Sequence, residues 1–194
     1  MAMELDHLVV GAASLEEGVA WCEQQFGVSP MPGGKHALMG THNLLLNISS
    51  DAYPRCYLEI IAIDPEAPPP TRARWFDLDQ PALQAALSQR AGLIHWVARV
   101  PSLEAALAQW RGEGVDAGVA VAATRGALSW RIALREDGRR LRREGLPVLI
   151  EWGAAHPCDA LPASGVQLQS WEARDGLTAT LLTPRGELKL ELLA

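Results

Sequence analysis

Apolar and polar positions follow the same succession twice along the chain. Residues 5–10 form a short run typical of a β-strand, and residues 15–26 carry apolar side chains at spacings of three and four, as an amphipathic helix does. The same succession of strand and helix returns at 93–98 and 103–110. The pattern therefore indicates an internal repeat.

The two copies keep the same spacing between their landmarks. His95 follows His7 by 88 residues, and Leu103 follows Leu15 by the same interval. In each copy a serine precedes the helix as a candidate N-cap, and a glycine follows it as a candidate stop. Equal spacing of polar and apolar landmarks favours a duplicated unit over a chance similarity.

Further strand-like runs follow each helix. They lie at 39–41, 43–48 and 56–63 in the first copy and at 119–123, 130–135 and 147–152 in the second. Each copy therefore has the order βαβββ. We expect an α+β fold in which two tandem βαβββ modules form curved mixed sheets around a cavity.

The repeat divides the chain into four parts. We expect a first module at 1–64, a Pro-rich connector with a helix at 65–91, a second module at 92–153 and a C-terminal β extension at 154–194. Three alternating runs separated by Asp175-Gly176 and Arg185-Gly186 predict that the extension is antiparallel and that it extends or covers a sheet.

A glutamate lies in the last strand of each copy, 52 residues after His7 and 56 residues after His95. Strand alternation predicts that Glu59 and Glu151 both point away from the face that the helices cover. A carboxylate among apolar neighbours is costly unless something neutralises it, and one metal cation would do so for both. A lone strand histidine is more often a hydrogen-bonded core residue, and a lone strand glutamate usually faces water. The duplication favours one shared site.

The composition is that of an ordinary globular protein, with 48% hydrophobic and 21% charged residues and a formal net charge of −6. A negative protein has no overall field that attracts nucleic acid, and no apolar run reaches the ~20 residues that span a bilayer. The basic cluster of Arg139, Arg140, Arg142 and Arg143 has acidic neighbours, so we expect a solvated loop. We therefore expect neither a nucleic-acid nor a membrane partner.

Cysteine usage indicates the compartment. Cys22, Cys56 and Cys158 are widely spaced and odd in number, which predicts reduced thiols rather than a disulfide framework. The first residues lead straight into a strand, without the basic region or the small-residue cleavage site that we would expect of a leader. Together these features predict a cytoplasmic protein.

Four segments carry a resemblance to a known family. They are Leu5-Asp6-His7-Leu8-Val9-Val10, Gly33-Gly34-Lys35-His36, Gly40-Thr41-His42-Asn43 and Tyr57-Leu58-Glu59. With the repeated βαβββ pattern, they resemble the vicinal oxygen chelate superfamily, which includes glyoxalase I, extradiol dioxygenases and antibiotic-resistance proteins. Within that superfamily the chain is similar to the glyoxalase-like domains, over about residues 4–153.

The resemblance implies that His7 and Glu59 of one module meet His95 and Glu151 of the other around a divalent metal ion. Two nitrogen and two carboxylate donors suit Zn²⁺, Ni²⁺, Mn²⁺, Co²⁺ or Fe²⁺. By the same resemblance, Glu151 or Glu59 leaves the metal to act as the base, with Glu151 favoured. The metal would be a Lewis acid that stabilises an enediolate of a small carbonyl or vicinal-oxygen substrate, in a lyase or isomerase reaction.

Three alternatives are compatible with the sequence. A protein of this fold could bind a small molecule without chemistry, as resistance proteins do. The C-terminal strands could fill the cavity and leave no site. The modules could also pair across a homodimer instead of within one chain, since both arrangements use the same residues.

Other polar residues are candidates for substrate binding. His36, His42 and Asn43 lie around a glycine-rich bend, where the backbone can approach a ligand closely. Either histidine would hold a substrate oxygen or shuttle a proton, or would instead satisfy loop backbone groups. Arg131 would bind a substrate carboxylate, or would be an ordinary exposed strand arginine.

Four tryptophans are candidates for the wall of a pocket that holds a flat or apolar ligand. They are Trp75, Trp96, Trp130 and Trp152. Core packing is the more usual role of this side chain. Parity relative to the neighbouring metal-ligand candidates predicts that Trp96 and Trp152 pack beneath the helices.

Overall fold

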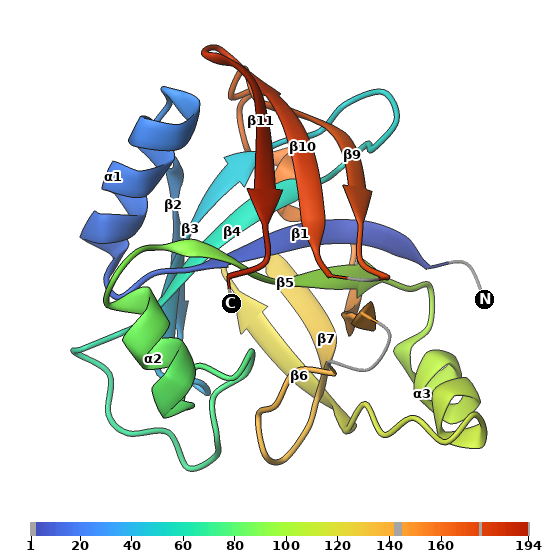
Figure 1. Ribbon diagram of the computed structural model, residues 1–194. Coiled ribbons are helices and arrows are strands. Elements are labelled where there is room, and N and C mark those ends of the chain that lie inside the picture. Colours follow the sequence, from blue (N-terminus) through green and yellow to red (C-terminus); the bar gives the residue numbers. More distant parts are fainter. Residues whose placement is uncertain (1–2, 142–144, 175, 194) are drawn as a thin grey trace.

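The computed structural model describes residues 3–141, 145–174 and 176–193 (Figure 1). The first copy of the repeat supplies β1 (Glu4–Gly11), α1 (Leu15–Phe26), β2 (Met31–His36), β3 (Thr41–Asn47) and β4 (Tyr57–Ile63). The second copy supplies β5 (Gly92–Arg99), α3 (Leu103–Gly112), β6 (Val119–Arg125), β7 (Leu128–Leu134) and β8 (Val148–Trp152). Helix α2 (Pro81–Leu87) lies between them in the chain. A short 3₁₀ helix (Pro157–Asp159) and the strands β9 (Gln167–Glu172), β10 (Thr178–Thr183) and β11 (Gly186–Glu191) follow.

Strands β1 to β8 form one mixed sheet in the order β2-β3-β4-β1-β5-β8-β7-β6. At its centre β1 and β5 run antiparallel, and each is parallel to the last strand of its own copy, β4 or β8. Figure 1 shows β1 in blue and β5 in green crossing the middle of the molecule, with β9 to β11 as a separate antiparallel sheet above them. The predicted α+β fold of two tandem βαβββ modules with a C-terminal antiparallel appendage is confirmed.

The helices begin where the sequence predicts. The hydroxyl of Ser14 accepts the Glu17 N–H at the start of α1, and that of Ser102 accepts the Ala105 N–H at the start of α3. Gly27 ends α1 with a φ of 77°, in the left-handed region that favours glycine. Of the helices in the described part of the chain, none combines the length and apolar character that crossing a membrane requires.

The two faces of the sheet have different coverings. On the face that α1 and α3 cover, which we call the outer face, the core includes Leu8, Leu58 and Leu149. Residues of the C-terminal strands, Leu168, Leu181 and Leu190 among them, belong to the same core. The appendage therefore covers the outer face. The opposite, inner face carries a second core, which includes Val9, Ile61, Ile132 and Ile150.

The sheet curls until its two ends meet. Strands β2 and β6 stand at opposite ends of the strand order. Nevertheless Arg125, the last residue of β6, donates a hydrogen bond to Asn43 of β3. The side chain of Arg125 also lies against Gly34 of β2, where an added Cβ would be 2.6 Å from it. The inner face is therefore concave, and it is closed by side chains from both copies of the repeat.

Three residues named in the sequence analysis, Arg142 and Arg143 of the basic cluster and Asp175 of a hairpin turn, lie outside the described residues.

Candidate functional site

The concave inner face encloses a small cavity. Its volume is about 30 Å³, enough for one or two water molecules. It is lined by His7, His36, Asn43, Tyr57, Glu59, Trp75, Phe76, Arg125, Trp130, Ile132, Ile150 and Trp152. Polar side chains of the first copy therefore share one narrow space with Arg125 and with aromatic and apolar side chains of the connector and the second copy.

A buried carboxylate orients His7 in this cavity. Asp6 Oδ1 lies 2.6 Å from His7 Nδ1, and Asp6 Oδ2 accepts hydrogen bonds from Trp152 Nε1 at 2.9 Å and His156 Nε2 at 3.0 Å. The ring of His7 stacks on Tyr57, with centroids 4.4 Å apart. These contacts leave His7 Nε2 facing Glu59 Oε2 at 3.6 Å.

A β-bulge explains why adjacent residues can both serve the site. Strict alternation would place Asp6 and His7 on opposite faces of β1. The register between β1 and β5 shifts between Leu5 and His7, so Asp6 is the extra residue of the bulge. The bulge is what allows its carboxylate to meet the ring of the next residue.

The electrostatics of this cluster favour charged side chains despite burial. Burial disfavours the imidazolium of His7, but hydrogen bonds with Asp6 and Glu59 outweigh it and raise the pKa of His7 to about 9. Burial would likewise raise the pKa of Glu59, but His7 and Asn43 hold it below its usual value. For Asp6, hydrogen bonds with His156 and His7 outweigh burial and lower the pKa. Near neutral pH, therefore, two carboxylates flank one imidazolium.

The amide of Asn43 connects Glu59 to Arg125. Asn43 Nδ2 donates to Glu59 Oε1 at 2.5 Å, and Asn43 Oδ1 accepts from Arg125 Nη1 at 3.1 Å. Space for this amide depends on Gly33, because a Cβ there would lie 2.1 Å from Asn43 Oδ1. The predicted close approach of a glycine backbone thus occurs, toward a side chain of the site.

His36 also faces the cavity, and it is neutral. Its Nδ1 lies 3.1 Å from Thr41 Oγ1, and its Nε2 lies 3.4 Å from both Asn43 Nδ2 and Arg125 Nη1. Burial lowers the pKa of His36 to about 4. Since both neighbours of Nε2 are donors, this nitrogen is an acceptor inside the site.

His42 lies elsewhere. On β3, Thr41, Asn43 and Leu45 alternate with His42, and Asn43 faces the inner cavity. His42 is therefore on the opposite side of the strand, where its Nδ1 lies 4.0 Å from Asp64 Oδ1. The structure gives it no place in the inner cavity.

Glu151 is not on the face that alternation predicted. Its carboxylate accepts the Leu103 N–H at the start of α3 at 2.6 Å and two hydrogen bonds from Arg131 at 2.8 and 2.9 Å. The preceding residue, Ile150, lines the inner cavity, so Glu151 belongs to the outer face. The prediction is wrong because β8 presents Ile150, not Glu151, to the concave side.

The same reversal applies to neighbouring residues of the second copy. Arg131 lies opposite Ile132 on β7, and Ile132 is the residue that lines the cavity. Arg131 instead pairs with Glu104 and Glu151 on the outer face. Trp152 lines the cavity, which corrects its predicted place beneath a helix, whereas Trp96 packs in the outer core.

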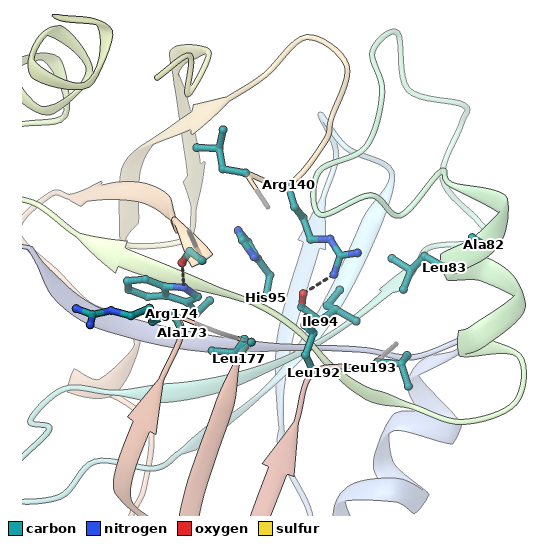
Figure 2. Close-up of a pocket in the computed structure, with 14 residues that line it drawn as sticks. Ala82, Leu83, Ile94, His95, Arg140, Ala173, Arg174, Leu177, Leu192 and Leu193 are labelled. Carbon is teal, nitrogen blue, oxygen red and sulfur yellow. Dashed lines mark hydrogen bonds between the residues drawn. The ribbon is translucent and has the colours of Figure 1, made fainter. Parts of the chain in front are cut away.

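His95 lines a second, larger cavity of about 430 Å³ (Figure 2). The residue lies opposite Val9 on the neighbouring strand, and its ring contacts Phe76 with centroids 5.8 Å apart. Figure 2 shows Leu177 and Leu192 at the same cavity, which thus lies between β5 and the C-terminal sheet. The size is typical of a small-molecule pocket.

Arg140 borders this second cavity and is not part of a solvated loop. Its side chain is 7% exposed and pairs with Asp77 at 2.9 Å, while its guanidinium also donates to the carbonyl of Ile94 (Figure 2). Phe76 and Asp77 have φ values of 59° and 62°, a strained backbone for side chains of this kind. The ion pair with Arg140 helps to hold that turn against the inner cavity.

The expected four-donor metal set does not fit the inner cavity. His7 and Glu59 face each other there, but Glu151 is on the outer face and His95 lines the other cavity. Within residues 3–141, 145–174 and 176–193, no three His, Cys, Asp or Glu side chains gather closely enough to hold a metal ion. We therefore assign no reaction step to a metal.

Three residues of the site were not found from the sequence. Asp6 is hidden by the bulge, and His156 comes from the segment after the second copy of the repeat. Arg125 reaches the site because the sheet closes on itself. The one available signal was the position of Asp6 next to His7 in an apolar strand, where a charged residue needs a partner.

Comparison with known proteins agrees with this architecture. The fold is similar to those of a hypothetical protein from Staphylococcus aureus (TM-score 0.56, 12% identity, 99% of this chain and 86% of that one) and a hypothetical protein from Bacillus halodurans C-125 (0.50, 13%, 80% and 97%). Methylmalonyl-CoA epimerase from Mycobacterium tuberculosis matches with a TM-score of 0.46, 15% identity and coverage of 81% and 91%. At these identities the likeness to the two hypothetical proteins concerns the fold alone. No curated protein matches the chain.

Paired βαβββ modules that curl around a shared cavity define the fold of the vicinal oxygen chelate superfamily. The sequence profile described as "Glyoxalase-like domain" matches residues 5–179, which include both copies of the repeat and part of the C-terminal sheet. The chain belongs to the glyoxalase-like domain family.

Proposed function

We propose that the protein is an enzyme that removes a proton from a carbon next to a carbonyl group of a small oxygenated compound, with Glu59 as the base. The observation that carries the proposal is the carboxylate of Glu59, which is 6% exposed and held in the inner cavity by His7 and Asn43. A fixed carboxylate that is ionised near neutral pH is able to accept a proton.

The neighbouring side chains suit the charge that such a step creates. The proton moves from carbon to Glu59, and the electron pair of the broken C–H bond moves onto the carbonyl oxygen. The imidazolium of His7 is a cation beside Glu59 at the same cavity and would stabilise that oxygen. Return of the proton to the other side of the carbon, or to a neighbouring atom, completes an isomerase reaction. Loss of a neighbouring group completes a lyase reaction.

The aromatic walls serve the same step. Trp75, Phe76, Trp130 and Trp152 close the cavity against water, and a water-poor site strengthens each electrostatic contact inside it. Asp6 maintains the arrangement by holding the Nδ1 side of the His7 ring, which keeps Nε2 directed at Glu59. Orientation of His7 is thus the contribution that Asp6 makes to the proposed reaction.

Hydrogen–deuterium exchange tests the proposal. Hydroxyacetone and pyruvate are incubated with the protein in D₂O, and loss of the proton signal next to the carbonyl is followed by ¹H NMR. We expect exchange with the natural protein and a rate lower by roughly 10²–10⁴-fold in Glu59→Gln, the usual contribution of a general base. Glu151→Gln, on the outer face, is the matched control and keeps the natural rate. Equal rates in the natural protein and Glu59→Gln overturn the proposal.

The same assay tests the metal that the family resemblance implies. Exchange is measured after treatment with a chelator and after addition of Zn²⁺, Ni²⁺, Mn²⁺, Co²⁺ or Fe²⁺. Because His7 Nε2 and Glu59 are the donors that face each other, His7→Gln is the variant that removes any metal effect on the rate. If Glu151→Gln removes it too, the donor set extends beyond the inner cavity.

A second candidate function is binding of a small molecule without chemistry. The cavity of about 430 Å³ favours it, because this volume accepts a small molecule without displacement of side chains. An environment-sensitive apolar dye should bind there, and Ala82→Trp, at an exposed position of α2 that lines the cavity, should weaken its binding. Dye binding that depends on Ala82, with no proton exchange in the natural protein, favours this second function.

A further inference from the structure

Arg125 presents an unneutralised positive charge to the inner cavity. The residue ends β6 and is half-buried. Its Nη1 donates to Asn43 Oδ1 at 3.1 Å and lies 3.4 Å from His36 Nε2. Both partners are neutral groups, since burial keeps the imidazole of His36 unprotonated at neutral pH. In the described part of the chain, no carboxylate forms an ion pair with this guanidinium.

The neighbouring arginine of the same hairpin has the opposite surroundings. Arg131 of β7 contacts two carboxylates, Glu104 at 2.6 Å and Glu151 at 2.8 Å. The charge of Arg131 is thus neutralised within the protein on the outer face. A half-buried guanidinium that lacks such a partner is costly, and an anion that enters the cavity would neutralise it.

We infer that the substrate of this site is a small carboxylate, a 2-oxo acid in its simplest form, and that Arg125 binds its carboxylate group. This inference rests on the proposed function, because it supplies the substrate class for the reaction of Glu59. The planar guanidinium fork matches the two oxygens of a carboxylate. A 2-oxo acid then places its carbonyl group beside the bound carboxylate.

The distance between the two charged groups fits such a substrate. Glu59 and Arg125 are one amide apart, since the side chain of Asn43 contacts both. A carboxylate bound to Arg125 therefore brings carbons one or two bonds away within reach of Glu59. The cavity of about 30 Å³ does not hold a substrate beside the present side chains, so the carboxylate replaces the Asn43 carbonyl as the partner of Arg125.

The reaction expected of pyruvate balances without a co-reactant. Glu59 takes a proton from the methyl carbon, and the electron pair of that C–H bond forms the enolate at the neighbouring carbonyl. In D₂O the carboxyl group of Glu59 exchanges its proton for deuterium and returns deuterium to the carbon. The carboxylate of pyruvate stays on Arg125 throughout.

Calorimetric titration with pyruvate and with methyl pyruvate tests the inference. The two probes share the carbonyl and the methyl carbon and differ in the negative charge. We expect pyruvate to bind the natural protein and the ester to bind at least about tenfold more weakly, the effect of losing one charged hydrogen-bond partner. Arg125→Gln should weaken pyruvate binding by about ten- to hundredfold and leave the weak binding of the ester unchanged. Arg125→Lys keeps the charge but loses the planar guanidinium, so its affinity for pyruvate should lie between those of the natural protein and Arg125→Gln.

Controls separate recognition from folding and from chemistry. Arg111→Gln, an exposed arginine of α3, should bind pyruvate like the natural protein, and the melting temperature of Arg125→Gln should be no lower than that of the natural protein. Equal binding of ester and acid, no binding of either, equal binding of inorganic phosphate and pyruvate, or unchanged pyruvate binding in Arg125→Gln overturns the inference. Arg125-dependent pyruvate binding without exchange in D₂O supports the carboxylate site and instead overturns the proposed role of Glu59.

Discussion

Strands β4 and β8 occupy equivalent places in the two halves of the sheet, each parallel to the first strand of its half. In the first half Val9 pairs with Glu59, and in the second half Val97, 88 residues later, pairs with Val148. The register position of Glu59 is therefore held by Val148 in the second half. Glu151 lies three residues after Val148. Because side chains alternate between the two faces of a strand, Glu151 points to the outer face.

This difference teaches that the duplication preserved the backbone and not the site. Both halves keep the strand order, the helix N-caps and the parallel pairing of first and last strands. The first half supplies the buried acid–imidazole–acid cluster. The second half supplies Trp130, Trp152 and Arg125, and the connector adds Trp75 and Phe76. The halves thus complement each other instead of contributing the same donors twice.

The largest expected effect is on the rate of proton exchange, which should depend on Glu59 and not on Glu151. Glu59→Gln should lower the rate of proton exchange by roughly 10²–10⁴-fold, because the base is removed while its shape and hydrogen bonding to Asn43 remain. Glu59→Asp keeps the charge but withdraws it by one methylene group, so its rate should fall between those of Glu59→Gln and the natural protein. Exchange in D₂O followed by NMR gives all three rates. A rate for Glu59→Asp below that of Glu59→Gln would contradict a role as base.

The next effect concerns stability and compares a buried with an exposed ion pair. Asp6 accepts from His7, Trp152 and His156 and is fully buried. Asp6→Asn should lower the free energy of unfolding by about 3–5 kcal/mol, because it leaves the buried imidazolium of His7 without its main partner. Urea denaturation measures the loss.

A matched control for that prediction lies on the surface. Asp137 pairs with Arg135 at 3.0 Å, and its side chain is 42% exposed. Asp137→Asn should cost at most about 1 kcal/mol, since water screens the pair. Similar losses for Asp6→Asn and Asp137→Asn would show that the buried cluster stabilises no more than a surface contact.

The comparison of the halves also shows what a sequence can and cannot predict here. The fold followed from local signals: apolar periodicity, serine caps and the 88-residue interval each report on one segment at a time. The family resemblance implied that His7 and Glu59 meet, and their side chains lie 3.6 Å apart. Which face of β8 each residue occupies did not follow from the sequence. Apolar residues line both sides of this strand, and alternation alone does not tell which side is concave.

Two further features depend on tertiary geometry that no local pattern records. Asp6 enters the site through a register shift between β1 and β5, which is a property of two strands and not of either alone. Arg125 meets Asn43 because the sheet curls until its ends come together. Nothing in the sequence around Arg125 indicates that the two ends of the sheet come together.

The third effect is a dependence of stability on pH that His7 of the first half causes. The pKa of His7 is about 9 in the folded protein and near 6.5 in the unfolded chain, so the folded state binds more protons between these values. Its contribution to stability is complete below about pH 6.5 and is lost as the pH rises through 9. For chelator-treated protein we expect a loss on the order of 3 kcal/mol between pH 7 and 10. Urea unfolding at each pH measures it.

His7→Gln is the control for this pH dependence, because glutamine does not titrate. The variant should be less stable at pH 7, and its stability should change less than that of the natural protein between pH 7 and 10. Deprotonation of other groups over the same range affects both proteins alike and cancels in the difference. Equal slopes in the two proteins would mean that His7 is neutral in the folded state.

The smallest expected effect belongs to the outer face of the second half. Arg131 and Glu151 form a pair at 2.8 Å, but their side chains are 36% and 24% exposed. A double-mutant cycle of Arg131→Gln and Glu151→Gln should give a coupling energy of about 1 kcal/mol or less, reduced further by salt. Glu151→Gln alone should cost somewhat more than Arg131→Gln, because Glu151 also accepts the Leu103 N–H at the N-terminus of α3. Neither variant should slow proton exchange. A coupling energy above about 2 kcal/mol together with a loss of exchange would instead place Glu151 in the chemistry, and the two halves of the sheet would then share the reaction after all.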